Sequence, residues 1–172
     1  MNGIILVLPI IFARYGLPGI LNKDATGRVA FFPPTEGKEK VAHWVYQITA
    51  LFLVVILIFI RINLDDILNY IGLGICVIAM ILYIISIVQF SKPNQNGLNV
   101  DGLYKITRNP MYVTFFLYFL GCSILANSWL LLFILIIFQI STHYLILSEE
   151  RWCIKKFKGE YKNYMNRVRR YI

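Results

Sequence analysis

Polar side chains that are suited to binding a small ligand gather in two stretches of an otherwise apolar chain. The first, residues 89–112, carries amide side chains at Asn94, Gln95, Asn96 and Asn99, and then the turn-forming pair Asp101-Gly102 and the pair Asn109-Pro110. The second is the adjacent pair Glu149-Glu150. Such groups offer hydrogen bonds to a polar ligand, and carboxylates attract cationic groups strongly where water is scarce. The alternatives are a solvated loop and surface salt bridges, and composition does not separate them.

The cysteines and histidines do not form a recognisable metal site. Cys76, Cys122 and Cys153 have no C-x-x-C spacing, and two of the three lie in apolar runs, where a thiol behaves as a small hydrophobe. His43 and His143 are 100 residues apart and have no third ligand nearby. We therefore predict no metal. His143 is a candidate general base, although packing is the commoner role of a histidine on an apolar helix.

The composition is that of a membrane protein. Of the 172 residues, 58% are hydrophobic and 15% are charged, yet the net charge is +8. Soluble domains are about 45–50% apolar, so the composition excludes an ordinary water-soluble enzyme, a disulfide-rich secreted domain and a disordered chain. The basic residues therefore favour anionic lipid headgroups, and not nucleic acid, as the partner.

Apolar runs of sufficient length predict an all-α bundle of about five transmembrane helices. A span needs about 20 mainly apolar residues. Residues 42–61 and 67–90 form one predicted hairpin, and residues 111–147 form a second, with a turn at Asn127-Ser128. Residues 1–21 are expected to form a further membrane helix, which spans if it reaches Leu21. The whole chain, 1–172, is interpreted as a single membrane domain.

The basic residues lie on one side of both predicted hairpins. Of the 17 Lys and Arg residues, 16 fall within residues 14–41, 91–110 and 148–172, and the exception is Arg61. By the positive-inside rule this side is cytoplasmic. We therefore expect a multi-pass protein, in the cell membrane, with its polar linker and its tail on the cytoplasmic side.

Residues 148–172 form a basic tail in which aromatic and basic residues recur at roughly helical spacing. This pattern predicts an amphipathic helix at the membrane interface, which Gly159 is expected to break or kink. Because the turn at 127–128 is short, the last two spans are antiparallel neighbours. The linker 91–110 and the start of the tail should therefore meet in one shared site.

A series of short motifs follows in a particular order along the second half of the chain. They read Gly102-Leu103-Tyr104, Arg108-Asn109-Pro110-Met111-Tyr112, Glu149-Glu150, Phe157-Lys158-Gly159-Glu160-Tyr161 and Val168-Arg169-Arg170. In this order and separation they resemble the superfamily of isoprenylcysteine carboxyl methyltransferases and phospholipid methyltransferases, which are integral membrane enzymes. The resemblance covers about half the chain, from Gln89 onward.

The resemblance implies S-adenosyl-L-methionine as methyl donor and a lipophilic acceptor that enters from the bilayer. Carried over by position, it implies cofactor contacts from Gln89, Asn96, Gly97, Leu98, Asn99, Tyr104, Asn109, Pro110, Met111, Tyr112 and Glu150. It also implies that Arg108 pairs with a carboxylate of the ligand or the protein. Glu149 is a candidate base, and Arg108 and Glu149 are the expected catalytic residues.

The acceptor stays open. Asn109 stands where the prenylcysteine enzymes commonly have histidine, and Ile146 stands in place of an arginine associated with their substrate. The sequence Asn-Pro-Met-Tyr is more similar to the phospholipid branch, so a phospholipid amine, a prenylcysteine carboxylate, a small thiol and a hydrophobic metabolite are all candidates. The alternative functions are a sterol-reductase-like enzyme that uses NADPH, against which the short chain argues, and a non-enzymatic scaffold with a lipid-binding tail. The oligomeric state is not predicted.

Overall fold

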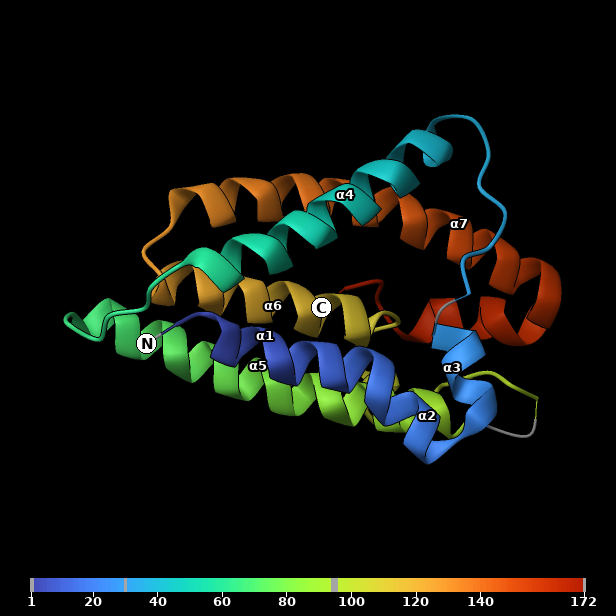
Figure 1. The fold of residues 1–172 in the computed structure, drawn as a ribbon. Helices are drawn as coiled ribbons and strands as arrows, with labels where there is room; N and C mark the ends of the chain where they lie inside the picture. The colour runs from blue at the N-terminus through green and yellow to red at the C-terminus, as the bar shows by residue number, and fades with distance from the viewer. Residues whose placement is uncertain (1, 30, 94–95, 172) are drawn as a thin grey trace.

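The computed structural model describes residues 2–29, 31–93 and 96–171, with the backbone alone for residues 23–25 (Figure 1). Asn94 and Gln95, which belong to the predicted binding linker, lie outside this part. The elements in chain order are α1 (Ile4–Ile11), the π-helix η1 (Phe12–Gly16), α2 (Leu17–Leu21), α3 (Lys23–Val29), α4 (Lys38–Phe59), α5 (Ile67–Ser91), the short 3-10 helix η2 (Gly102–Lys105), α6 (Pro110–Leu125) and α7 (Trp129–Arg167). In the described ranges every named element is a helix, which confirms the all-α prediction.

Four helical stretches are long and apolar enough to cross a membrane: Ile4–Leu21, Lys38–Phe59, Ile67–Ser91 and Trp129–Arg167. The first of these runs through α1, η1 and α2 without a break, so the N-terminal helix does reach Leu21. The helix α6 is apolar but has only 16 residues. With α6 as a short fifth span, the bundle matches the prediction of about five transmembrane helices.

The helix ends follow from local sequence. Asp66 and Asn69 form a reciprocal capping box at the start of α5. Pro110 occupies the first turn of α6, where its missing N–H is harmless. Between α6 and α7, Asn127 adopts a left-handed φ of 46° and the Ser128 hydroxyl accepts a hydrogen bond from the Leu131 N–H. The helix ends fixed by these caps agree with the hairpin turns that the apolar runs predict.

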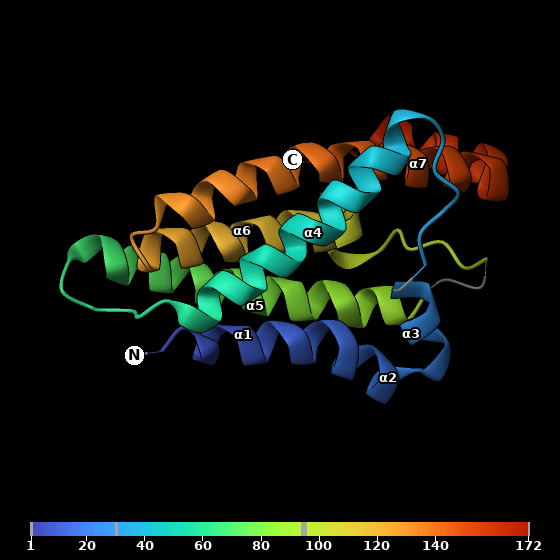
Figure 2. The same ribbon diagram turned by 45° about the horizontal axis from the view of Figure 1, so that its top comes forward.

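Helix α7 differs from its expected end at residue 147, because it continues to Arg167 and is 39 residues long. Glu, Lys and Arg are good helix formers, so the helix propensity does not stop where the hydrophobicity does. The expected break near Gly159 is confirmed, one residue earlier, at Lys158 (φ 49°, ψ −120°). Figures 1 and 2 show the last turns of α7 bending back toward the bundle.

Helices α5 and α6 cross at close range. A Cβ atom added at Gly121 would lie 2.8 Å from the backbone nitrogen of Cys76 and 3.0 Å from the carbonyl oxygen of Gly72. Small residues allow membrane helices to approach this closely and to gain dispersion contacts. The Asn69 side chain also donates to the Leu125 carbonyl at 2.9 Å, which ties the two helix ends together.

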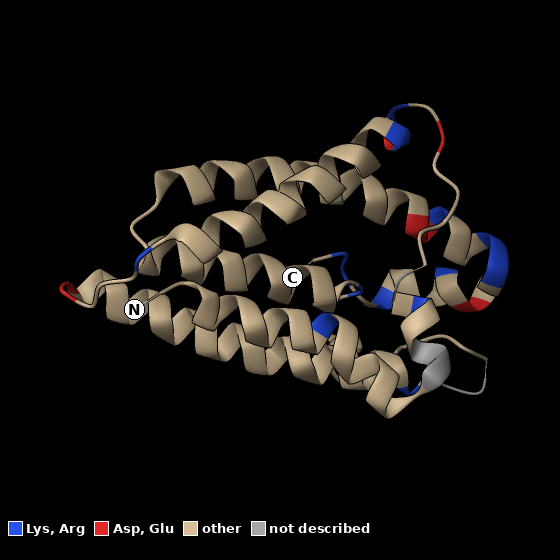
Figure 3. Cartoon of the chain, in the orientation of Figure 1, with Lys and Arg blue, Asp and Glu red and all other residues tan. Residues whose placement is uncertain are grey.

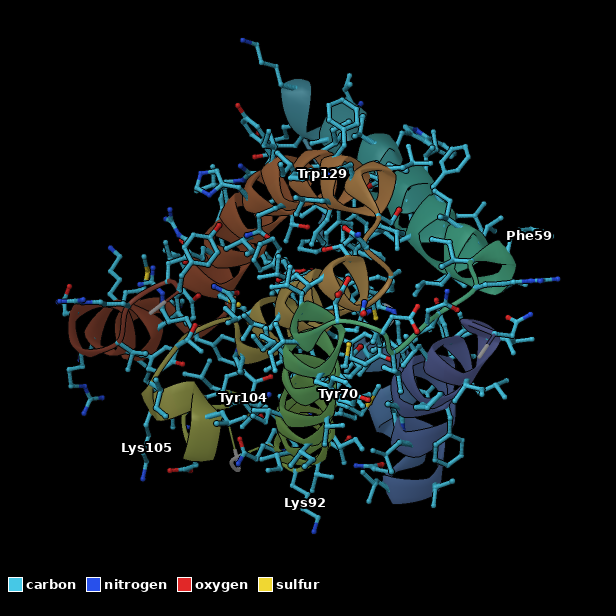
Figure 4. The ribbon with its side chains drawn as sticks, turned by 90° about the vertical axis from the view of Figure 1, so that its left-hand side faces the viewer. Phe59, Tyr70, Lys92, Tyr104, Lys105 and Trp129 are labelled. Carbon is cyan, nitrogen blue, oxygen red and sulfur yellow. The ribbon has the colours of Figure 1, made fainter. Side chains whose placement is uncertain are left out.

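The remaining helices complete a bundle whose outer surface is apolar. Helix α4 packs on α7 and on α1, and the segment α1–α2 lies along α4 and α5 (Figure 2). Large apolar side chains stay outside, and Phe59, which is 80% exposed, projects from the edge of the end-on view in Figure 4. Such a surface is expected of a protein whose solvent is lipid.

The two ends of the bundle differ in charge. The turns at 60–66 and 126–128 lie at one end of the bundle, and the described residues of segments 22–29, 31–37, 96–109 and 148–167 lie toward the other (Figure 1). From there the chain after Arg167 runs back along the bundle, where Tyr171 reaches His143. Figure 3 shows most of the Lys and Arg residues at the second end, and a blue band within the N-terminal helix. We call this the basic end of the bundle.

Candidate functional site

A cavity of about 880 Å³ opens at the basic end of the bundle. This volume falls in the range typical of small-molecule sites. Its lining is rich in aromatic side chains: Phe31, Phe32, Tyr46, Phe90, Tyr104, Tyr112, Phe115, Trp152, Phe157, Tyr161 and Tyr164. The charged residues of the lining are Arg14, Arg28, Arg108, Lys156, Glu149 and Glu150.

The cavity brings together the two polar stretches singled out in the sequence. Its lining includes these residues of the linker and of α6: Gly97, Leu98, Asn99, Tyr104, Arg108, Asn109, Met111 and Tyr112. It also includes both Glu149 and Glu150 from α7. The antiparallel packing of α6 and α7 accounts for the meeting, because residues before Met111 and after Leu147 then share one end.

Three of the residues implied as cofactor contacts lie outside the lining of this cavity: Gln89, Asn96 and Pro110. Gln89 instead accepts a hydrogen bond from the Leu103 N–H at 2.8 Å through Oε1. Its side chain fills the space beside Gly102 (φ +62°), where an added Cβ would overlap it. Gln89 therefore holds the turn that presents Tyr104. Asn96 donates to Glu160 Oε1 at 3.0 Å, and Pro110 is buried at the start of α6.

The Glu150 carboxylate is bound by two arginines. Arg108 Nη2 lies 2.8 Å from Oε1, and Arg170 donates to Oε1 from Nε at 3.0 Å and to Oε2 from Nη2 at 2.7 Å. The hydrogen bonds to this carboxylate raise the pKa of Arg170 above its ordinary value. The side chains of Glu150 and Arg108 are only 6% and 8% exposed, so this ion-pair cluster is almost dry.

One N–H donor of Arg108, at Nε, has no hydrogen-bond partner among the described residues. The Nη1 of Arg108 donates to the Met165 carbonyl at 3.3 Å, whereas Nε is buried. A buried donor without an acceptor is costly in a folded protein. Arg108 lines the cavity, so a ligand acceptor would reach its Nε only if the side chain shifted on binding.

Residues 168–171, which we call the C-terminal strap, fold back across the segment that precedes α6. The Arg108 N–H donates to the Arg169 carbonyl at 2.9 Å. Thr107 Oγ1 and Asn109 Nδ2 both donate to the Arg170 carbonyl, at 3.1 and 3.0 Å. The strap therefore holds Arg108 and Asn109 and, through Arg170, also Glu150, and all three of these residues line the cavity. Both segments carry motifs noted in the sequence, but nothing in those motifs predicts that they pair, because they lie about 60 residues apart.

His143 is also held by the strap. Its Nδ1 lies 2.8 Å from the Tyr171 hydroxyl, and the two rings are stacked with their centroids 6.2 Å apart. His143 is not among the residues that line the cavity. The geometry therefore gives this histidine a contact with the strap, away from the cavity.

Glu149 faces the cavity beside aromatic rings. The Tyr112 hydroxyl donates to Glu149 Oε1 at 2.6 Å. The rings of Tyr112 and Tyr46 pack edge to face with centroids 6.4 Å apart, and Tyr46 stacks on Phe138 at 5.0 Å. The carboxylate is thus oriented by a hydroxyl that is itself fixed by packing.

Phe31 and Phe32, from the N-terminal half of the chain, line the cavity together with Trp152 of α7, and we call these three residues the aromatic cap. The N-terminal half contained no motif that could be interpreted from the sequence. Phe31 packs on Trp152 with centroids 5.1 Å apart, and the Lys156 ammonium lies 4.6 Å from the centre of the Trp152 ring. Arg151 and Glu39 form a paired ion bridge at 2.6 Å that fastens the start of α4 to α7. The doubled Phe31-Phe32 before two prolines is the signal that could have indicated this cap.

Two arginines of the lining were not predicted as site residues. Arg28, on α3, lies 4.7 Å from the centre of the Phe90 ring and donates to the Gly97 carbonyl at 3.4 Å. Burial lowers the pKa of Arg28 from its ordinary value. Arg14, on η1, lies inside the N-terminal membrane helix. Its sequence signal was a single cation in an apolar run, which the charge analysis had counted with the cytoplasmic residues.

The donor set of the cavity fits a nucleoside with a zwitterionic tail. Aromatic faces suit a purine ring, amide groups and Glu149 suit hydroxyl and amino groups, and the spare Arg108 Nε suits a carboxylate. Within the described ranges, no cluster of three or more His, Cys, Asp or Glu side chains is placed to share a metal ion.

Comparison with known proteins adds two findings. Residues 67–160 match the sequence model of a family described as phospholipid methyltransferase. The chain is also similar to the protein-S-isoprenylcysteine O-methyltransferase of Schizosaccharomyces pombe, with 35% identity over 81 residues. That match covers 45% of this chain and 34% of the relative, so it spans about a third of the relative's length. The family match includes the linker, α6 and the part of α7 that carries Glu149 and Glu150, and so covers many of the residues that line the cavity.

Proposed function

The chain belongs to the phospholipid methyltransferase family, and we propose that it is an S-adenosylmethionine-dependent methyltransferase acting on a lipophilic acceptor at the membrane. The observation that carries this proposal is the single cavity lined by both the linker residues and the acidic pair of α7. A scaffold protein has no need of such a cavity. The resemblance of its motifs to those of membrane methyltransferases supports the same function.

Several lining residues would hold the cofactor. Tyr104 and Trp152 offer ring faces for the adenine, Asn99 and Asn109 offer amides for the ribose, and Arg108 Nε offers a donor for the methionine carboxylate. When bound, S-adenosylmethionine supplies a methyl group whose bond to a sulfonium breaks, with its electron pair passing to sulfur, as the bond to the acceptor forms.

The residues of this chain would contribute alignment and the exclusion of water. An in-line displacement gains most of its rate from holding the reacting atoms at the right distance and angle. The aromatic cap and the C-terminal strap enclose the site, which removes water that would solvate the nucleophile. Glu149, oriented by Tyr112, would accept a proton where the acceptor atom carries one.

We propose that the acceptor is a phospholipid amine or an isoprenylcysteine carboxylate, the two classes named by the family and the relative. The apolar outer surface would let such a molecule reach the cavity from the bilayer. We further propose that the basic end faces the cytoplasm in the cell membrane, with residues 1–172 acting as one membrane domain. The tail beyond the kink at Lys158 would then bind anionic headgroups.

Calorimetric titration of the detergent-solubilised protein with S-adenosylmethionine, S-adenosylhomocysteine and NADPH tests this function. We expect saturable binding of the two adenosyl ligands, weakened at least tenfold by Tyr104→Ala. Lys105→Ala is the matched control, because Lys105 is the next residue but its side chain is 69% exposed and pairs with Asp101. Figure 4 shows Lys105 pointing away from the bundle and Tyr104 lying closer to the helices.

The other outcomes contradict the proposal. Binding of NADPH alone would indicate a reductase, and the absence of binding by any of the three ligands would indicate a scaffold. A methyl-transfer assay with radiolabelled S-adenosylmethionine and lipid extract then identifies the acceptor by the mobility of the labelled product.

A further inference from the structure

Arg14 is a charged residue within the membrane-spanning part of the chain. It is the only Lys, Arg, Asp or Glu between Ile4 and Leu21. It stands about 15 Å along the helix axis from Ile4, given a rise of 1.5 Å per residue. A charge at this depth is costly, and intramembrane ionisable residues generally serve a binding or transport function.

The local backbone at Arg14 is also unusual. Arg14 lies in the π-helical turn η1, between the α-helical segments α1 and α2. Single π turns within α-helices are rare and are frequent at functional sites. Here the turn lies on the cavity, and Arg14 is one of the lining residues.

Within the described part of the chain, Arg14 forms contacts with hydroxyl groups and a ring but no direct ion pair. Its Nη2 donates to the Tyr46 hydroxyl at 3.4 Å, the Tyr83 hydroxyl is a further partner, and its guanidinium lies 5.8 Å from the centre of the Tyr15 ring. Among the described residues, no carboxylate oxygen lies within 4.0 Å of it, since the ion pairs found there involve other cations. Hydroxyl groups solvate a guanidinium but do not neutralise it.

Among the described residues, the rest of the cavity gives Arg14 no direct ion-pair partner. Of the two lining carboxylates, Glu150 is already paired with Arg108 and Arg170. Glu149 accepts the Tyr112 hydroxyl and interacts with Arg14 electrostatically, but the two form no ion pair within 4.0 Å. The lining carries four cationic residues, Arg14, Arg28, Arg108 and Lys156, against these two carboxylates. A cavity with this balance favours an anionic occupant.

We propose that Arg14 binds an anionic oxygen of the methyl acceptor, either a carboxylate or a phosphate, and so selects acidic acceptors over neutral ones. This inference rests on the proposed function. A guanidinium binds carboxylate or phosphate through two parallel hydrogen bonds, and the surrounding low dielectric strengthens the pairing. Since Arg14 lies within the membrane-spanning helix, the acceptor's anionic group would enter the bundle while its hydrocarbon chain stays in lipid.

The test measures binding of defined probes through a fluorescent reporter in the cavity. Trp152 lines the cavity, whereas Trp44 and Trp129 are 68% and 80% exposed. Replacing those two by Phe leaves Trp152 as the reporter. Two matched probe pairs are titrated: dihexanoyl phosphatidic acid against dihexanoylglycerol, and N-acetyl-S-farnesylcysteine against its methyl ester. Each pair differs in one anionic group.

We expect the protein to bind the anionic member of one pair at least tenfold more tightly than the neutral member. A preference in the first pair assigns phosphate, and a preference in the second assigns carboxylate. Arg14→Gln should abolish the preference, and Arg14→Lys should retain part of it. Arg61→Gln is the control, because Arg61 is an exposed arginine at the opposite end of the bundle. An Arg14→Gln variant that keeps the full preference overturns the proposal.

Titration with S-adenosylhomocysteine in parallel separates this inference from the proposed function. If Arg14→Gln retains S-adenosylhomocysteine affinity and loses the anion preference, both stand. If the unmodified protein binds no S-adenosylhomocysteine, the proposed function fails, whatever the probe pairs show. If Arg14→Gln weakens S-adenosylhomocysteine binding as strongly as probe binding, Arg14 belongs to the cofactor site, and the assignment to the acceptor is wrong.

Discussion

The Tyr112 hydroxyl and the Glu149 carboxylate lie 2.6 Å apart, one at the start of α6 and the other on α7. Both groups line the cavity. The Tyr112 ring, which belongs to α6, therefore fixes the orientation of the Glu149 carboxylate on α7. A shift of α6 relative to α7 would therefore move the Glu149 carboxylate within the cavity.

Replacing Tyr112 by Phe should weaken the binding of S-adenosylhomocysteine by about tenfold or more. A hydrogen bond to a charged group contributes about 1.5–3 kcal/mol, and without it the Glu149 side chain is free to change rotamer. Calorimetry measures the affinity. Tyr144→Phe is the control, because Tyr144 is an α7 tyrosine that is 41% exposed and not among the lining residues. Equal affinities for the two variants would show that the bond has no role in binding.

Replacing Glu150 by Gln should destabilise the protein. Removal of one partner from a buried ion pair typically costs about 3–5 kcal/mol, because the remaining charges stay buried. For a chain of this length such a loss lowers Tm by roughly 10 °C. Thermal unfolding in detergent measures it. Glu160→Gln, at an exposed carboxylate that accepts from Asn96, should leave Tm nearly unchanged. An unchanged Tm in Glu150→Gln would mean that the arginines do not depend on this carboxylate.

Replacing Gly102 by Ala should lower both Tm and cofactor affinity. Gly102 has a φ of +62° and lies against the Gln89 side chain. A left-handed backbone costs a non-glycine residue about 1–2 kcal/mol, and the overlap adds to this. Gly74→Ala is the matched control, since Gly74 is in α5 with nothing near its missing Cβ. That change should be neutral or stabilising by up to about 1 kcal/mol. The prediction does not survive if the two variants melt at the same temperature.

Truncation of the chain after Arg167 removes the C-terminal strap and should lower S-adenosylhomocysteine affinity at least tenfold. The strap binds Thr107, Arg108 and Asn109, and its Arg170 pairs with Glu150, so its loss frees residues that line the cavity. Circular dichroism should show that the helical content is retained. Tyr171→Phe removes only the contact with His143 and should have a small effect. A truncated protein that binds at full affinity would limit the strap to a surface contact.

The proposed orientation predicts opposite labelling of two engineered cysteines. With the three native cysteines replaced by serine, Lys158→Cys and Asp65→Cys place exposed thiols at the two ends of the bundle. A membrane-impermeant maleimide should label position 65 in intact cells, and position 158 only after the cells are opened. This expectation follows from the positive-inside rule, because the Lys and Arg residues are concentrated at the basic end of the bundle. The reverse labelling pattern would place the cavity on the outer side.

The bundle could be predicted from hydrophobicity and charge, because each span is a local property of about 20 residues. Asn127-Ser128 and Pro110 marked helix ends for local reasons of turn and capping chemistry. A helix beyond Leu147 was predicted, but as a separate amphipathic element. Its continuity with the last span as one helix of 39 residues was not predicted, because the loss of hydrophobicity was interpreted as the end of the span. The kink was expected at Gly159, next to the residue that adopts the positive φ.

The site was predictable only in part. The linker and Glu149-Glu150 were recognisable as polar groups that the hairpin must bring together. The pairing of Glu150 with Arg170 and the contact of Phe31 with Trp152 were not predicted, because the order of motifs along the chain does not show which side chains meet in space. Gln89 was assigned a cofactor contact, whereas in the structure it supports the backbone of the neighbouring turn. A motif shows which residue type stands at a position, but it does not show whether that side chain points into the cavity or away from it.

The 16 residues of α6 are too few to cross a typical bilayer unaided. At 1.5 Å per residue the helix is about 24 Å long, whereas the hydrocarbon layer of a typical membrane is about 30 Å thick. No residue of α6 is exposed, because α5 and α7 pack against it and are longer, with 25 and 39 residues. The neighbouring helices therefore absorb the length mismatch, and the bilayer beside α6 does not need to thin. The short helix thus leaves room at the basic end for a polar cavity within the thickness that the longer helices span.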